Sequence, residues 1–230
     1  MVFNPFLWLY KENMNFRMNI AKRFNIFGKL SYALEGDDMF LWRLFTERFK
    51  LYDGFFIDVG ANHPKVYNNT WRLRKLGWRG INIEPSEHIK YFYKYRKDDI
   101  NLRCLISSNG IENIFYYNKE YPELSFAGGK IRTEYTEKIK LPVKSLAQIC
   151  KENNVTSIDL LDVDVEGTEL DVLESHNWEI KPKVIMCEIN DADRMDMLDI
   201  LKNSETNKFI LDKGYKIIGK TTRSMFYQRS

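Results

Sequence analysis

The sequence has few cysteines, and none of them is spaced for a metal or for a disulfide framework. Cys104, Cys150 and Cys187 are the three cysteines of the 230 residues, and no two of them form a CxxC pair. Structural zinc sites and disulfide-stabilised secreted domains both depend on closely spaced cysteines. The pattern argues against these two classes and fits a reducing compartment, which we expect to be the cytoplasm.

Long apolar runs and a large excess of one charge are also missing. No stretch approaches the roughly 20 apolar residues that span a bilayer, and the aromatic segment 3–10 lacks the basic leader and cleavage site of a signal peptide. The net charge of +3 does not demand a nucleic-acid partner. We therefore expect no stable membrane span and no bound nucleic acid.

The length suits one α/β domain. We expect this domain over residues 31–230, preceded by an N-terminal arm over residues 1–30, which carries five Lys or Arg residues against one Glu. The arm either packs on the domain as a helical extension, touches a membrane surface or takes part in dimerisation. The sequence leaves the oligomeric state open, with a homodimer among the alternatives.

The most informative unit, residues 55–85, is poor in glycine. An apolar run at 55–57 leads into Asp58-Val59-Gly60-Ala61-Asn62, a helical stretch follows, and a second apolar run at 81–83 ends in Glu84-Pro85. The pattern predicts a strand, a turn, a helix and a strand with a carboxylate at each strand tip, where open α/β sheets bind ligands. Gly60 allows a ligand to approach the backbone closely, and Asn62 is suited to cap the following helix.

The spacing of the unit predicts a nucleoside ligand. Glu84 follows Asp58 at close to the roughly 20-residue offset at which an acidic residue binds a ribose hydroxyl. A dinucleotide fingerprint needs three glycines, whereas Asn62 and Lys65 occupy its second and third glycine positions. The turn therefore favours a nucleoside without a pyrophosphate. The simpler alternative is that Asp58 and Asn62 only form a turn and a helix cap.

Strands and helices alternate along the rest of the chain. We expect helices over 37–49, 70–76, 86–97, 145–152, 168–175 and 195–202, strands over 100–107, 114–117, 158–163 and 183–188, and a hairpin of 214–218 with 224–227. This order predicts a doubly wound α/β sheet, mostly parallel, with an antiparallel C-terminal hairpin. Segment 118–141 breaks the alternation with glycines, a proline and many charges, and we expect it to be an excursion that faces the substrate.

Acidic side chains follow four of the expected strands. They are Asp58, Glu84, Asp164 with Glu166, and Glu188 with Asp191. If these strands are parallel, the carboxylates meet in one crevice, where they must be protonated, hydrogen-bonded or bound to a metal. Such strained clusters are more often functional than structural.

Two roles are open for Asp164 and Glu188. One is a general base that accepts the proton of an attacking hydroxyl, and the other is a site for a hard divalent cation, Mg²⁺ or Mn²⁺, that polarises this hydroxyl. His63, just beyond the glycine turn, is a further candidate base or ligand, and its simpler alternative is a packing residue.

These pieces together resemble the FkbM-type S-adenosylmethionine-dependent methyltransferases, over roughly residues 31–228. The segments that carry the resemblance are Glu35-Gly36-Asp37-Asp38, Phe56-Ile57-Asp58-Val59-Gly60-Ala61-Asn62, Gly77-Trp78-Arg79-Gly80-Ile81-Asn82-Ile83-Glu84-Pro85, Asp164-Val165-Glu166-Gly167 with Glu169-Leu170, and Cys187-Glu188. The chain departs from the family pattern at Asp162, where Lys or Ser is more usual. This change adds negative charge and favours a bound cation.

The resemblance implies a Rossmann-like seven-stranded sheet and methyl transfer, usually to oxygen. It implies that residues 58–62 line the methionine part of the cofactor and that Glu84 holds its ribose. The full set expected to bind S-adenosylmethionine is Asp58, Gly60, Ala61, Asn62, Glu84, Pro85, Ser107 and Asp164. The set expected to take part in catalysis is Asp164, Glu166, Glu188 and His63, with Asp164 and Glu188 as the metal ligands if a metal is used.

The resulting prediction is an O-methyltransferase that acts on a sugar hydroxyl of a small-molecule acceptor, such as a nucleotide-linked sugar or another glycan precursor. One alternative is an NAD-dependent oxidoreductase of Rossmann type, which shares the strand, the turn and the acidic residue. The other is an RNA methyltransferase, for which the aromatic and basic segment 88–97 is the support.

Overall fold

The computed structural model describes residues 30–108, 114–118, 126–127, 137–189 and 196–230. The chain divides into two units, Met1–Ser31 and Tyr32–Ser230. The predicted N-terminal extension therefore lies almost entirely outside the described residues. Within those residues, no helix has the length and apolarity needed to cross a bilayer.

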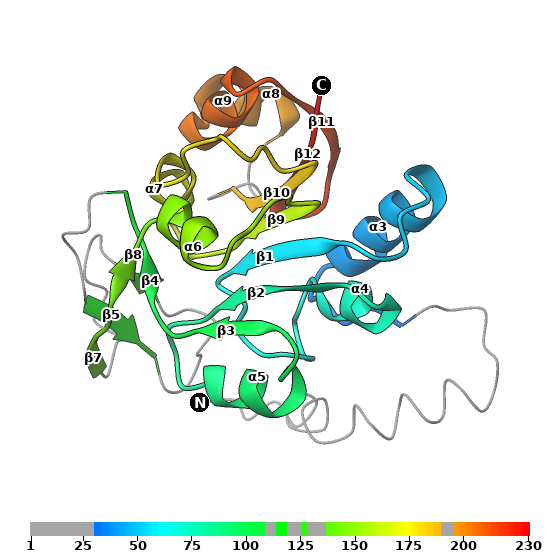
Figure 1. Ribbon diagram of the computed structural model, residues 1–230. Coiled ribbons are helices and arrows are strands. Elements are labelled where there is room, and N and C mark those ends of the chain that lie inside the picture. Colours follow the sequence, from blue (N-terminus) through cyan, green and yellow to red (C-terminus); the bar gives the residue numbers. More distant parts are fainter. Residues whose placement is uncertain (1–29, 109–113, 119–125, 128–136, 190–195) are drawn as a thin grey trace, which may run out of the picture. The chain divides into compact units, whose positions relative to one another are not determined.

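A seven-stranded sheet forms the centre of the second unit, in the order β11-β12-β10-β9-β1-β2-β3 (Figure 1). Its strands are β1 (Phe55–Val59), β2 (Arg79–Ile83), β3 (Ile100–Leu102), β9 (Leu160–Val163), β10 (Val184–Glu188), β11 (Tyr215–Lys220) and β12 (Ser224–Arg229). The strands from β3 to β10 in this order run parallel. β12 is antiparallel to β10, and β11 is antiparallel to β12. The predicted Rossmann-like doubly wound sheet with an antiparallel C-terminal hairpin is confirmed.

Both faces of the sheet are covered by helices. These are α3 (Asp37–Arg43), continued by the π-helical turn η1 (Leu44–Arg48), α4 (Trp71–Leu76), α5 (Ile89–Tyr95), α6 (Leu146–Glu152), α7 (Glu169–Glu174), α8 (Met197–Asn203) and α9 (Glu205–Asp212). Successive side chains of a strand point to opposite faces. Ile57 accordingly packs in the core cluster that contains residues of α6 and α7, and Phe56 packs in the cluster that contains residues of α3 and α4. Figure 1 shows these two helix pairs on opposite sides of the sheet.

The strand expected over 100–107 is divided into two. β3 ends at Leu102, and β4 (Leu105–Ile106) pairs instead with β8 (Val143–Lys144). The backbone changes partner here: the Leu102 carbonyl accepts from the Glu84 N–H, whereas the Leu105 N–H donates to the Pro142 carbonyl. The prediction of one continuous strand was wrong, because the pairing partner lies in a segment far along the chain.

The strand expected over 114–117 forms, but outside the central sheet. It is β5 (Ile114–Tyr117), and it pairs with β6 (Phe126–Ala127) and β7 (Glu137–Lys140) in a separate three-stranded sheet. The described parts of the predicted excursion 118–141 thus contain two strands. Leu105, Phe115 and Leu141 form the apolar cluster beneath this small sheet.

The helix expected directly after Asn62 does not form. The chain runs without a helix until α4 begins at Trp71, so Asn62 does not cap a helix. Asn62 and Tyr67 both have positive φ angles, of 52° and 51°. The side chain of Asn68 accepts hydrogen bonds from the backbone N–H groups of Thr70 and Trp71 and so starts α4. These local bonds compete with a longer helix.

Two further helix boundaries differ from the prediction. The helix expected over 86–97 begins only at Ile89, since the Ser86 hydroxyl accepts from the His88 N–H and forms a turn before it. The helix expected over 195–202 is α8, and the unpredicted helix α9 follows it. Ser204 separates the two by capping α9 through the Asn207 N–H.

Candidate functional site

A cavity of about 260 Å³ lies at the carboxyl ends of the parallel strands. Residues from the tips of β1, β2, β9 and β10 line it, together with residues of the small sheets and of the turn between β11 and β12. Seven of the eight residues expected to bind the cofactor are in this lining: Asp58, Gly60, Ala61, Asn62, Glu84, Pro85 and Asp164. The eighth, Ser107, is not, although its neighbours Leu105 and Ile106 are.

Gly60 forms the sharp turn after β1. Its φ angle is +85°, and a Cβ atom at this position would lie 1.7 Å from the Asp164 carbonyl oxygen. The N–H groups of Gly60 and Ala61 both donate to the Ile83 carbonyl, at 3.0 and 3.1 Å. The turn after β1 is therefore held against the tips of both neighbouring strands, and only glycine fits there.

Glu84 is buried at the tip of β2 and held by two backbone groups. One carboxylate oxygen accepts from the Asn62 N–H and the other from the Ser86 N–H, each at 2.7 Å. Burial raises the pKa of Glu84 to about 7, although these hydrogen bonds lower it. Each carboxylate oxygen has two acceptor positions, so the carboxylate, which also accepts from the Ser86 side chain, still has capacity for a ribose hydroxyl.

The loop between Asn62 and α4 is held by a buried arginine that the sequence did not identify. Arg96 is fully buried just beyond α5. Its guanidinium donates twice to the Pro64 carbonyl and once each to Asn82, Asn68 and Thr70. All five N–H groups are therefore used.

The same network reaches the tip of β1. The Thr70 hydroxyl donates to Asp58 at 2.6 Å, and the Asn68 amide donates to the Ala61 carbonyl at 3.0 Å. Burial raises the pKa of Asp58, and the Arg96 charge opposes this rise. Asp58 thus accepts hydrogen bonds from the Thr70 hydroxyl and, at 3.5 Å, from the Asn68 amide, with the Arg96 charge nearby. The sequence gives no local signal for Arg96, because it ends a helix that looks solvated.

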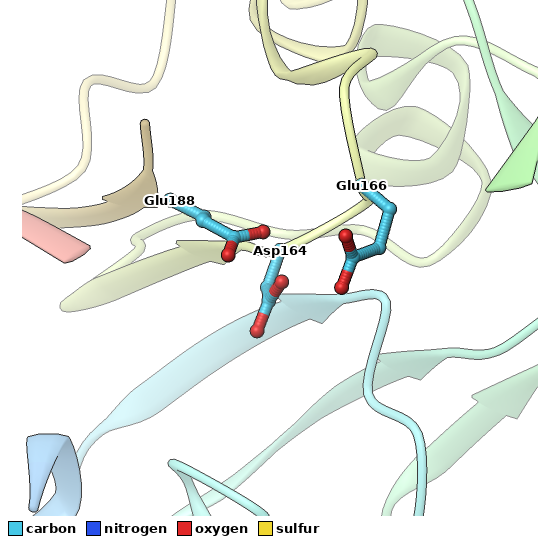
Figure 2. Close-up of side chains that lie close together, drawn as sticks. All are labelled: Asp164, Glu166 and Glu188. Carbon is cyan, nitrogen blue, oxygen red and sulfur yellow. The ribbon is translucent and has the colours of Figure 1, made fainter. Parts of the chain in front are cut away.

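Asp164, Glu166 and Glu188 form a cluster of carboxylates on the β9 and β10 side of the cavity. One carboxylate oxygen from each lies within 4.8 Å of those of the other two. Figure 2 shows the Asp164 side chain between those of Glu166 and Glu188. Burial and the adjacent Glu188 carboxylate raise the pKa of Asp164 well above its usual range. Glu188 is 8% exposed, and its Oε2 accepts no hydrogen bond from any described residue.

Asp162 lies outside this carboxylate group. It is buried within β9 and stands in register with Asp58 on β1. Burial, and then the Asp58 charge, raise the pKa of Asp162 well above its usual range. Asp162, where the resemblance led us to expect Lys or Ser, therefore lies behind the cavity and adds no fourth oxygen to the cluster.

His63 lies beside the cavity and forms hydrogen bonds within its own loop. Its Nδ1 accepts from the backbone N–H groups of Lys65 and Val66, and its ring packs near His88 and Tyr91. Burial, with the nearby His88, lowers the pKa of His63 to about 4. His63 is described by the structure and is not among the residues that line the cavity. Its catalytic role stays a prediction.

The fold and the cavity together define a class. A mostly parallel, doubly wound sheet carries a glycine turn after its first strand, a carboxylate at the tip of the second and no pyrophosphate-type glycine loop. This is the arrangement of a Rossmann-like methyltransferase. The sequence matches the methyltransferase FkbM domain family over residues 58–217. The match covers more than half of the chain, which therefore belongs to this family of S-adenosylmethionine-dependent methyltransferases.

Solved structures give a weaker likeness. The chain is 8% identical to a "putative caffeoyl-CoA O-methyltransferase" from Staphylococcus aureus, with a TM-score of 0.48, covering 97% of this chain and 98% of that one. It is 11% identical to precorrin-6y C5,15-methyltransferase from Geobacter metallireducens GS-15, with a TM-score of 0.38, covering 81% and 86%. Scores this low carry no argument about function. No curated protein matches the sequence significantly. Family membership favours methyl transfer over the nicotinamide-dependent alternative.

Proposed function

We propose that this protein transfers a methyl group from S-adenosylmethionine to a sugar hydroxyl of a nucleotide-linked sugar or another glycan precursor. The observation that carries the proposal is the contact between the Gly60 turn and Asp164, where a Cβ atom would meet the Asp164 carbonyl at 1.7 Å. The turn expected to hold the methyl donor and the carboxylates expected to handle the acceptor thus line one cavity.

The chemistry of the lining fits S-adenosylmethionine. Ile83, Ile106 and Phe115 offer apolar surface suited to a base, and Glu84 has acceptor capacity for ribose hydroxyls. The carboxylates of the cavity suit a positively charged sulfonium. When bound, the cofactor supplies an electrophilic methyl group, and the protein's task is to align the acceptor and remove one proton.

Asp164 is the proposed acceptor of that proton. Its carboxylate stands between those of Glu166 and Glu188, and its backbone carbonyl meets the glycine turn. A carboxylate held near a hydroxyl oxygen takes up the proton as that oxygen attacks. Glu188, buried at the tip of β10, would orient the same hydroxyl.

The same three carboxylates meet the requirements of a hard divalent cation. Oxygen ligands suit Mg²⁺ and Mn²⁺, and the Glu188 Oε2, which accepts no hydrogen bond within the described part of the chain, has acceptor capacity to spare. The cation would polarise the acceptor hydroxyl. Exhaustive chelation separates the two roles: a lost rate that returns with Mg²⁺ or Mn²⁺ supports the cation, and an unchanged rate supports Asp164 acting alone as the base.

A transfer assay with methyl-labelled S-adenosylmethionine tests the proposed function. The acceptor panel contains nucleotide sugars, sugar 1-phosphates, methyl glycosides, amino sugars and RNA. We expect the label on a sugar oxygen, released by treatments that cleave methyl ethers. Label found only on nitrogen, or only on RNA with steeply salt-dependent binding, would contradict the proposal.

A further inference from the structure

The cavity lining is strongly acidic and contains a single cation. Among the described lining residues, seven carry carboxyl groups: Glu35, Asp37, Asp58, Glu84, Asp164, Glu166 and Glu188. The one basic side chain in this described lining is Arg223, in the turn between β11 and β12. An anionic group entering the cavity is repelled by the carboxylates, so its most favourable position is beside Arg223.

The guanidinium of Arg223 has donors to spare. Its Nε lies 3.6 Å from Glu35, and its Nη1 lies 3.8 Å from Glu188. These separations give ion pairing but are too long for hydrogen bonds. The side chain is 45% exposed. Its N–H groups therefore make no hydrogen bond to any described residue, in contrast with Arg96, whose five donors are all used.

The backbone that carries Arg223 is nevertheless fixed. The Arg223 N–H donates to Glu35 at 2.9 Å, and its carbonyl accepts from the Ile189 N–H at 3.1 Å. The neighbouring Thr221 hydroxyl donates to Asp37 at 2.6 Å. The turn is thus tied to the start of α3 and to the end of β10. A guanidinium on a fixed turn pays little ordering entropy when it binds a ligand.

We propose that Arg223 is the anion-binding residue of the cavity, and that it holds a carboxylate or phosphate group of a bound molecule. The inference rests on the proposed function, because it assigns this group to the methyl donor or to its acceptor. The planar guanidinium donates two parallel hydrogen bonds to either group. Two sources carry this chemistry: the methionine carboxylate of the cofactor, and the phosphate of a nucleotide-linked or phosphorylated sugar.

Binding calorimetry on the full chain tests the proposal and separates the two sources. The variants are Arg223→Gln, which removes the charge, and Arg223→Lys, which keeps it. Arg43→Gln is the matched control, because Arg43 is exposed, is paired only with Glu47 within the described chain and does not line the cavity. The probes are S-adenosylhomocysteine, methylthioadenosine, which lacks the amino-acid carboxylate, and inorganic pyrophosphate added to the S-adenosylhomocysteine complex.

If Arg223 holds the cofactor carboxylate, Arg223→Gln lowers the affinity for S-adenosylhomocysteine by about tenfold or more, as expected for a lost charged hydrogen bond. The affinity for methylthioadenosine is then unchanged. If it holds the acceptor phosphate, S-adenosylhomocysteine binds as before and pyrophosphate binding is lost. In both cases Arg223→Lys retains part of the affinity, and Arg43→Gln retains all of it.

The proposal is overturned if Arg223→Gln changes the affinity for neither S-adenosylhomocysteine nor pyrophosphate. It is also overturned if the variant weakens the binding of S-adenosylhomocysteine and of methylthioadenosine equally, since Arg223 would then only offset the cavity's charge. These measurements use no methyl acceptor. Failure of every sugar in the transfer panel would therefore count against the proposed function and leave the binding result standing.

Discussion

The hydroxyl group of Thr70 bridges Arg96 and Asp58. Arg96 Nη1 donates to Thr70 Oγ1 at 2.8 Å, and Thr70 Oγ1 donates to Asp58 at 2.6 Å. The link connects the end of α5 to the tip of β1, which lines the cavity. The cofactor turn is therefore positioned by residues that lie behind it, in addition to its own glycine.

Loss of this buried link should be costly. Arg96→Met leaves Asp58 buried without its nearby cation and leaves the buried acceptors of Arg96 without their donor. We expect a loss of about 3–5 kcal/mol in the free energy of unfolding, the range for a buried charge that loses its compensation. Thr70→Val removes only the hydroxyl and should cost about 1–3 kcal/mol. Urea unfolding measures both. Arg43→Gln removes an exposed pair and should cost no more than about 1 kcal/mol. An Arg96→Met variant as stable as this control would contradict the account.

Gly60→Ala should damage the site more than an alanine at another glycine with the same backbone. Gly60 and Gly214 have φ angles of +85° and +90°, but a Cβ at 214 meets nothing within 4 Å. Gly214→Ala should therefore show only the backbone strain, about 1 kcal/mol. Gly60→Ala must also push the turn away from Asp164, and we expect S-adenosylhomocysteine binding to be lost. Calorimetry that finds equal affinities in the two variants would show that the close approach is unimportant.

Cofactor affinity should rise with pH around neutrality. The pKa of Glu84 is raised to about 7, so the group is largely protonated below that pH and ionised above it. Ribose hydroxyls donate best to the ionised carboxylate. We therefore expect S-adenosylhomocysteine to bind more weakly as pH falls below 7, by up to about tenfold per pH unit. Calorimetry between pH 6 and 8 measures this, and Glu84→Gln should bind weakly with no such dependence. A flat wild-type profile would remove Glu84 from the ribose site.

Acid should destabilise the fold through His176. Burial lowers the pKa of His176 to about 4 from an ordinary value of 6.5, and its Nδ1 accepts from the Trp178 N–H. Between these two pH values the unfolded chain binds the proton and the folded chain does not. Stability is therefore lost as pH falls from 6.5 to 4, by up to about 3 kcal/mol.

His176→Asn keeps an acceptor for Trp178 and removes the titrating ring. Its free energy of unfolding should fall less steeply over this pH range than that of the wild type, as measured by urea unfolding at several pH values. His63, whose pKa is also lowered to about 4, contributes equally to both proteins, so the difference in slope isolates His176. Identical slopes would show that His176 does not set the acid sensitivity.

The parts of the fold that could be predicted are those specified by neighbouring residues. Short apolar runs located β1, β2, β9 and β10, and the acids at their tips lie in one cavity as expected. Gly77 ends α4 with a φ angle of +117°, as a glycine after a helix usually does. These features depend on short-range sequence and on the geometry of parallel strands.

What could not be predicted depends on partners far along the chain. The division of segment 100–107 reflects pairing with Val143–Lys144. The loop after Asn62 is held by bonds to Arg96, which stands among lysines and tyrosines and looked like a surface residue. Arg223 was overlooked because a turn between two strands gives no sign that it faces a cavity. Each of these contacts joins residues that lie far apart in the sequence.

The central claim is that Asp164 removes the proton when a sugar hydroxyl is methylated. The most direct measurement is the rate of labelled methyl transfer by Asp164→Asn, with S-adenosylhomocysteine affinity measured on the same protein and Asp199→Asn, an exposed residue of α8, as the control. We expect Asp164→Asn to lose at least about a hundredfold in rate, as for a removed general base, and to keep its S-adenosylhomocysteine affinity within a few fold. The rate and the affinity of the control should be unchanged. Wild-type transfer by Asp164→Asn would contradict it.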